Sequence, residues 1–191
     1  MPELRPKVAE LFEYMDETRT ALFDLARNMN PSLAQIRPRS GSWSASEHLA
    51  HLSLVERAAL RVMTKSIEQA RASGIDADTS DESFIRSLDR FRVPETLTKL
   101  TAPERIAPNA STSVEESIVS LEASRAQLKQ IITGNSDIAL NRIVFPHPVL
   151  KELDMYQWAL FVAQHEERHR RQMERTLDEV TERAAECAPI V

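Results

Sequence analysis

The sequence predicts an all-α protein, a four-helix bundle that forms one domain over residues 1–191. Only three glycines and ten prolines interrupt the chain, and both residue types are disfavoured inside helices. Four long windows lack them entirely: 7–30, 42–73, 109–133 and 149–188. Apolar residues recur in these windows at steps of three and four, the period of an amphipathic helix. Four such helices can bury their apolar faces only against one another.

Each window has its own support. The first carries an apolar stripe of Val8, Leu11, Met15, Leu22, Leu25 and Met29. The second and third open with the capping-box patterns Ser44-x-x-Glu47 and Ser113-x-x-Glu116. The third continues with a stripe of Val114, Ile118, Leu121, Leu128 and Ile132, and the fourth with Trp158, Val162 and Met173. These patterns predict helices rather than strands.

The segment 74–108 is too long for a simple connection between two helices. We expect a short helix near 81–91, followed by a stretch bounded by Pro94, Pro103 and Pro108. A long connection of this kind allows the second and third helices to run in the same direction. The single strand-like run is short and covers 142–145.

Composition narrows the class of protein. The formal net charge of −5 offers no broad basic field for nucleic acid. The single cysteine, Cys187, excludes a framework of intrachain disulfides and indicates a reducing compartment. The N-terminus lacks the apolar segment of a signal peptide, and no uncharged apolar run has the length of a membrane helix. We therefore expect a cytoplasmic protein that binds neither membrane nor nucleic acid.

Four of the five histidines fall on two predicted helices. His165 and His169 lie four residues apart on the apolar face of the fourth helix, a spacing that lets both rings reach one metal ion. His48 and His51 lie near the start of the second helix, and periodicity does not decide which of the two faces the fourth helix. Glu47, four residues before His51, could orient that ring or could serve only as the capping-box acid.

His165-Glu166-Glu167-Arg168-His169 spells the H-E-x-x-H pattern of zinc proteases. Only 22 residues follow His169, and they continue the same helix axis away from the site, so a third ligand must come from upstream. No strand edge is predicted to hold a peptide, and Glu166 lies about 100° around the helix from His165. We therefore interpret Glu166 as a solvated glutamate or one behind the ligands. A di-iron site is excluded because a second Glu-x-x-His pair is missing.

Two motifs resemble those of the DinB/YfiT-like superfamily of small, mostly bacterial metal-binding proteins. They are Trp43-Ser-Ala-Ser-Glu-His-Leu-Ala-His51 and His165-x-x-x-His169-x-x-Gln172. The resemblance implies a four-helix bundle with a long connection between helices 2 and 3. It also implies a metal triad of His51, His165 and His169, which prefers His51 to His48. The implied cofactor is one divalent transition metal (zinc, nickel or iron) with open positions for water or substrate.

Further residues near the motifs have two interpretations each. Gln172 could bind a ligand or water, or could be a polar flank of the apolar stripe. Trp43 could touch substrate but is expected to pack against the end of the bundle. His147, between two prolines, could line the mouth of the site but is expected to lie in a surface loop.

The resemblance implies a metal-dependent enzyme that acts on small molecules, either a thiol S-transferase with a low-molecular-weight thiol as substrate or a hydrolase. The sequence contains no Gly-rich phosphate loop and no serine nucleophile motif that would identify a catalytic residue. Two alternatives stay open: a non-catalytic bundle that binds a metal or a partner, and a metal-free bundle whose histidines satisfy one another. A homodimer is compatible with the family.

Overall fold

The computed structural model describes residues 4–95, 102–109 and 111–186. Its long helices are α1 (Pro6–Asn28), α3 (Ala45–Ala72), α4 (Val114–Thr133) and α5 (Met155–Glu186), with one short helix, α2 (Pro31–Ala34), after α1. Each long helix occupies one predicted window, although α1 begins one residue earlier, at Pro6. The predicted helical bundle is confirmed, with one small β-hairpin in addition.

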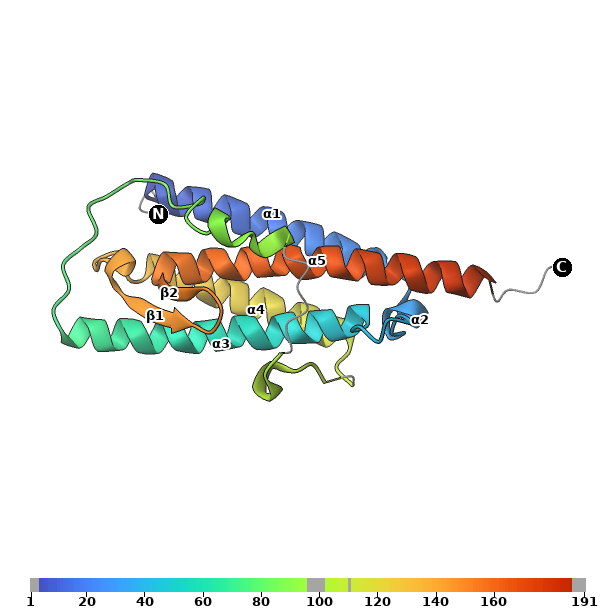
Figure 1. The fold of residues 1–191 in the computed structure, drawn as a ribbon. Helices are drawn as coiled ribbons and strands as arrows, with labels where there is room; N and C mark the ends of the chain where they lie inside the picture. The colour runs from blue at the N-terminus through green and yellow to red at the C-terminus, as the bar shows by residue number, and fades with distance from the viewer. Residues whose placement is uncertain (1–3, 96–101, 110, 187–191) are drawn as a thin grey trace.

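The four long helices form two parallel pairs. Figure 1 shows α1 and α5 running in one direction while α3 and α4 run in the other. Helix α3 packs against both α4 and α5, and α1 packs against α5. The parallel arrangement of α3 and α4 confirms the expectation from the long connection between them. It also places the first half of α3 beside the middle of α5 (Figure 1).

Side-chain caps mark where α3, α4 and α5 begin. The Ser44 hydroxyl accepts from the Glu47 backbone N–H at 3.2 Å, and the Glu47 carboxylate accepts from the Ser44 N–H at 2.9 Å. Ser113 and Glu116 form the same capping box at α4. Helix α5 has a similar reciprocal pair: the Gln157 N–H donates to Asp154 Oδ1 at 2.9 Å, and the Asp154 N–H donates to Gln157 Oε1 at 3.1 Å.

The helix expected near 81–91 is absent. This part of the connection forms turns that end in a 3-10 turn, η1 (Asp89–Phe91), followed by η2 (Val93–Glu95). The reason is local, because short polar side chains bind backbone N–H groups two residues ahead and thereby replace the helical bonds. These bonds run from Ser80 N–H to Asp78, from Glu82 N–H to Ser80 and from Ile85 N–H to Ser83. The proline-bounded stretch contains η3 (Glu104–Ile106), while its residues 96–101 lie outside the described part.

A two-stranded antiparallel hairpin precedes α5. Its strands are β1 (Val144–His147) and β2 (Lys151–Asp154), paired so that Val144 faces Asp154. The strand expected at 142–145 is therefore real but begins two residues later. Strand β2 occupies the start of the fourth window, which is why α5 begins at Met155 rather than near 149.

The apolar core of the described residues has two parts. The larger contains Leu11, Met15, Met63, Leu128 and Leu160 among others, and the smaller contains Leu22, Leu49, Leu121 and Met173. The two parts follow one another along the bundle axis, because residues 11–15 and 22 of α1 lie in different parts. The histidines lie at the side of this core, between α3 and α5.

Candidate metal centre

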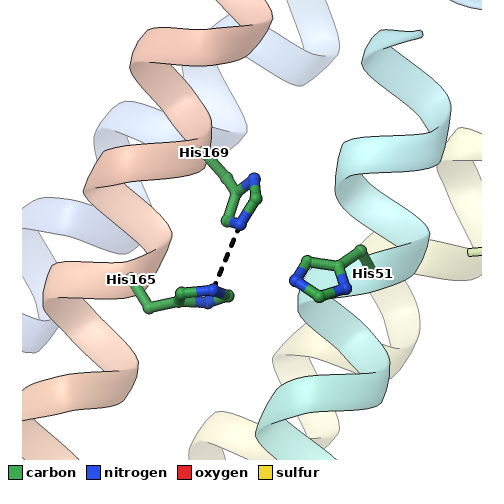
Figure 2. A group of neighbouring side chains, drawn as sticks. All are labelled: His51, His165 and His169. Atoms are coloured by element: carbon green, nitrogen blue, oxygen red, sulfur yellow. Dashed lines mark hydrogen bonds between the residues drawn. The ribbon is translucent and has the colours of Figure 1, made fainter. Parts of the chain in front are cut away.

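Three histidine rings from two helices converge on one point. His51 comes from α3, and His165 and His169 lie one turn apart on α5. One nitrogen of each ring lies within 4.8 Å of the other two, and the Nε2 atoms of His165 and His169 are 3.1 Å apart. Figure 2 shows one nitrogen of His51 pointing toward that pair. Two ligands of a tetrahedral zinc-like ion stand about 3.3 Å apart, so the pair is already close to ligand spacing.

A backbone carbonyl fixes the tautomer of His51. Nδ1 of His51 lies 2.7 Å from the carbonyl oxygen of Ile106 in η3. A carbonyl only accepts, so Nδ1 must carry the proton and donate it. Nε2 then keeps its lone pair, which is the form that a metal ion needs.

His48 lies behind His169 rather than in the triad. Nδ1 of His48 is 2.9 Å from Nδ1 of His169, and both rings are buried. If His169 offers the Nε2 lone pair to an ion, its Nδ1–H donates to His48. The structure thus brings His51, His165 and His169 together, and it gives His48 the position of a hydrogen-bond partner.

Trp43 lies over the histidines. Its ring centroid is 4.8 Å from that of His51, 5.5 Å from that of His48 and 6.1 Å from that of His169. The expectation that Trp43 packs only against the end of the bundle was therefore incomplete. An indole at this place restricts the access of water to the rings.

His147 is not a member of the triad, although it is not isolated in a surface loop either. It ends β1, and its ring lies 4.3 Å from the ring of Phe161, which in turn lies 5.2 Å from that of His165. Nδ1 of His147 accepts from the N–H groups of Val149 and Leu150 and so closes the hairpin turn.

Glu47 and Gln172 have different surroundings. The Glu47 carboxylate binds the Ser44 N–H and the guanidinium of Arg37, whereas the partner of His51 Nδ1 is Ile106. Glu47 is thus the capping-box acid. The side-chain oxygen of Gln172 is buried and has no hydrogen-bond partner among the described residues. This acceptor is therefore unused within the described residues.

The interpretation of Glu166 as a solvated glutamate was wrong. Glu166 is 1% exposed and is bonded to Arg19 at 2.8 Å and to Arg125 at 3.0 Å. Its position 100° around the helix from His165 directs it into the core rather than to solvent. Because two arginines occupy this carboxylate in the core, we do not assign it the role of the general base of a protease.

Burial keeps the imidazoles neutral. It lowers the pKa of His48 to about 3, and the neighbouring His51 adds to the effect. Burial also lowers the pKa of His165 and His169 well below the usual value, and the adjacent imidazoles lower it further. For His51, burial lowers the pKa while the bond to Ile106 acts in the opposite direction. Neutral rings with lone pairs turned toward one point suit a divalent ion.

Some of these features had no signal in the sequence. The group that binds Nδ1 of His51 is the backbone carbonyl of Ile106, and a residue of any type could supply such a carbonyl. Glu56, Arg19 and Arg125 did have a signal that was missed: each is a charge inside an apolar helical stripe, four residues after one buried apolar side chain and three residues before another.

Comparisons with known proteins concern the family and the fold. Residues 14–173 match the sequence profile of the DinB superfamily. The uncharacterized protein YuaE of Bacillus subtilis (strain 168) is 25% identical over 170 residues, which cover 88% of this chain and 98% of that protein. The crystal structure of TT2238, a four-helix bundle protein, superimposes with a TM-score of 0.58 at 20% identity and covers 87% of this chain and 96% of the other. The last likeness concerns the fold alone.

Proposed function

This chain belongs to the DinB superfamily, and from that premise we propose that it is a metal-dependent enzyme acting on small molecules. His51, His165 and His169 would hold one divalent transition ion such as zinc, nickel or iron. The observation that carries the proposal is the convergence of one nitrogen from each ring within 4.8 Å. Three neutral imidazoles and no protein carboxylate leave coordination positions for an exogenous group.

The reaction would be thiol S-transfer or hydrolysis. A bound ion of this kind lowers the pKa of a thiol or a water and so supplies a nucleophile near neutral pH. The residues of this chain have separate tasks. His51 is held by the Ile106 carbonyl, His169 is held by His48, and the Gln172 oxygen can accept a hydrogen bond from the incoming molecule.

The alternative is a metal-binding bundle without turnover. It is favoured by one observation: His51 and His169 are 4% and 5% exposed, and Trp43 lies against both. An ion so covered would be difficult for a substrate to reach. Substrate-induced change in the surroundings of the ion therefore distinguishes the two candidates.

Within the described residues, no helix combines the length and the hydropathy needed to cross a membrane. With one cysteine in the chain, we propose that the protein works in the cytoplasm. There low-molecular-weight thiols are abundant and reduced.

The first experiment is elemental analysis of the untagged protein by inductively coupled plasma mass spectrometry. Wild type is compared with His51→Ala and with His147→Ala, a histidine outside the triad. We expect about one transition ion per chain in wild type and His147→Ala and a loss in His51→Ala. If wild type contains no metal and takes up none when metal is added, the proposal is contradicted.

The second experiment uses protein loaded with cobalt, whose visible bands report on its ligands. Millimolar cysteine or glutathione should change these bands in the enzyme, because a thiolate takes an open position. Unchanged bands in a protein with confirmed cobalt would exclude S-transfer and favour the closed metal site. Release of product from ester or amide substrates without thiol would support hydrolysis instead.

A further inference from the structure

Four charged side chains are buried together in the centre of the bundle, one from each long helix. We call Arg19, Glu56, Arg125 and Glu166 the ionic layer. Their side chains are 9%, 2%, 6% and 2% exposed, respectively. Two positive and two negative charges leave the layer neutral.

The layer is a closed ring of alternating charges. Arg19 donates to Glu166 at 2.8 Å and to Glu56 at 2.7 Å. Arg125 donates to the same two carboxylates, at 3.0 Å in each case. Each arginine therefore joins α3 to α5, and each glutamate joins α1 to α4.

The arginines also bind main chain across the bundle. Arg19 of α1 donates to the carbonyl oxygen of Leu121 in α4, and Arg125 of α4 donates to that of Met15 in α1. Each acceptor lies one turn before the opposite arginine. The pair of bonds defines one longitudinal register between α1 and α4.

The layer separates the two parts of the apolar core. Met15, Ala59, Leu128 and Ala163 belong to the larger part and lie on one side of it along their helices. Leu22, Leu52, Leu121 and Met173 belong to the smaller part and lie on the other side.

The layer is adjacent in sequence to the ligands. Glu166 directly follows His165, and Glu56 follows His51 by five residues, a rise of about 7.5 Å along α3. The two helices that carry the triad are thus joined through the arginines within about one and a half turns of the rings.

We propose that the ionic layer positions the metal centre by fixing the rotation and register of α3 against α5, an inference that rests on the proposed function. Apolar side chains tolerate small shifts between helices, because neighbouring contacts are nearly equivalent. The planar fork of an arginine accepts a carboxylate in few geometries, and a buried charge displaced from its partner is costly. The layer therefore selects the one arrangement in which the three rings converge.

The test exploits the difference between stability and positioning. Replacing a complete buried ion cluster by apolar residues of similar volume often preserves or raises stability. The variant Arg19→Met/Glu56→Met/Arg125→Met/Glu166→Met should keep its helical circular dichroism and melting temperature. We expect its cobalt affinity to fall at least tenfold and its visible bands to change. A folded variant with the affinity and bands of wild type would overturn the proposal.

A milder variant covers the case in which the fourfold replacement does not fold. Arg19→Lys keeps the charge and loses the fork, and Arg170→Lys makes the same change in a partly exposed ion pair with Glu167. We expect cobalt to bind severalfold more weakly in Arg19→Lys and as in wild type in Arg170→Lys. Equal affinities in the two variants would contradict the role of the layer.

A metal-free measurement keeps this proposal separate from the proposed function. The ring centroids of His51 and His169 are 4.8 Å apart, close enough for nuclear Overhauser contacts between their protons. These contacts should be present in metal-free wild type and weaker in Arg19→Lys. If wild type binds no metal, the proposed function fails, while retention of the contacts in Arg19→Lys would overturn the role of the layer independently.

Discussion

The ionic layer and the histidine triad are two buried polar groups that share α3 and α5, yet they differ in how their polar atoms are compensated. In the layer, Glu56 and Glu166 each bind both arginines, so its charges are balanced within the chain. In the triad, burial favours neutral rings, and Nε2 of His165 and Nε2 of His169 form a hydrogen bond with each other at 3.1 Å. The charges of the first are paired without a ligand, although Oε1 of Glu166 is buried without a hydrogen-bond partner among the described residues, whereas the second would be satisfied best by a cation.

This contrast shows how burial alone does not identify a functional site. Both groups place costly polar atoms in the protein interior. The layer offsets that cost with opposite charges from the four helices, whereas in the triad one nitrogen of each ring faces the other two, and no charged group of the described residues completes the set. A group that is buried, convergent and incomplete is the better candidate for ligand binding.

The largest expected effect comes from opening the layer. Glu166→Gln leaves Arg19 and Arg125 with one carboxylate between them, and we expect a loss of about 3–5 kcal/mol in the free energy of unfolding. Urea denaturation measures it. The matched change Glu167→Gln, in a partly exposed acid paired with Arg170 and Arg171, should cost less than about 1 kcal/mol. Similar losses in both variants would show that the layer contributes no more than a surface pair.

The triad should instead make the metal-free protein sensitive to acid. The pKa values of His48, His51, His165 and His169 are lowered in the folded state, so below about pH 6.5 unfolding takes up protons. The free energy of unfolding is therefore highest above about pH 6.5. As the pH falls below that value, it decreases by up to about 1.4 kcal/mol per pH unit for each histidine. Melting curves between pH 7.5 and 5 test this. A melting temperature that stays constant or rises toward pH 5 would contradict neutral buried histidines.

Removing the partner of His169 should weaken metal binding by about 10–100-fold. In His48→Leu the His169 Nδ1–H loses its acceptor, whereas His48→Gln can supply an amide oxygen and should recover part of the affinity. Competition with a chromophoric chelator measures the affinity. Equal losses in the two variants would indicate that His48 acts only through its volume.

The smallest effect provides a reference for stability alone. Ser113→Ala removes the cap of α4, a helix that contributes Arg125 to the layer and no histidine to the triad. We expect a loss of about 1 kcal/mol and an unchanged metal affinity. If metal affinity falls with this variant, then general destabilisation, and not a defined position, explains weaker binding in the others.

The sequence predicted the bundle because its signals are local and periodic. The absence of glycine and proline from four windows and the two serine capping boxes located α1, α3 and α4 to within a few residues. The start of α5 was misplaced since the hairpin before it contains no breaker after Pro148, although Asp154-x-x-Gln157 marks the boundary. The connection was harder, because its serine and aspartate side chains favour turns over a helix.

For the candidate site, spacing predicted that His165 and His169 share a face, but it did not separate His48 from His51. That choice depends on the rotation of α3 relative to α5, which is a tertiary property. The Ile106 carbonyl, the cover provided by Trp43 and the core position of Glu166 depend on the same packing. Long-range contacts of this kind leave no periodic trace in one sequence.

The origin of the ionic layer in four separate helices has a kinetic consequence. Any partly docked bundle, with one helix detached, would bury at least one charge without its full set of partners. Such intermediates have a high free energy, so the two parts of the apolar core should not form one after the other. The chain should fold and unfold in a single cooperative step, and the slow event should be the arrival of the last helix rather than the growth of an apolar nucleus.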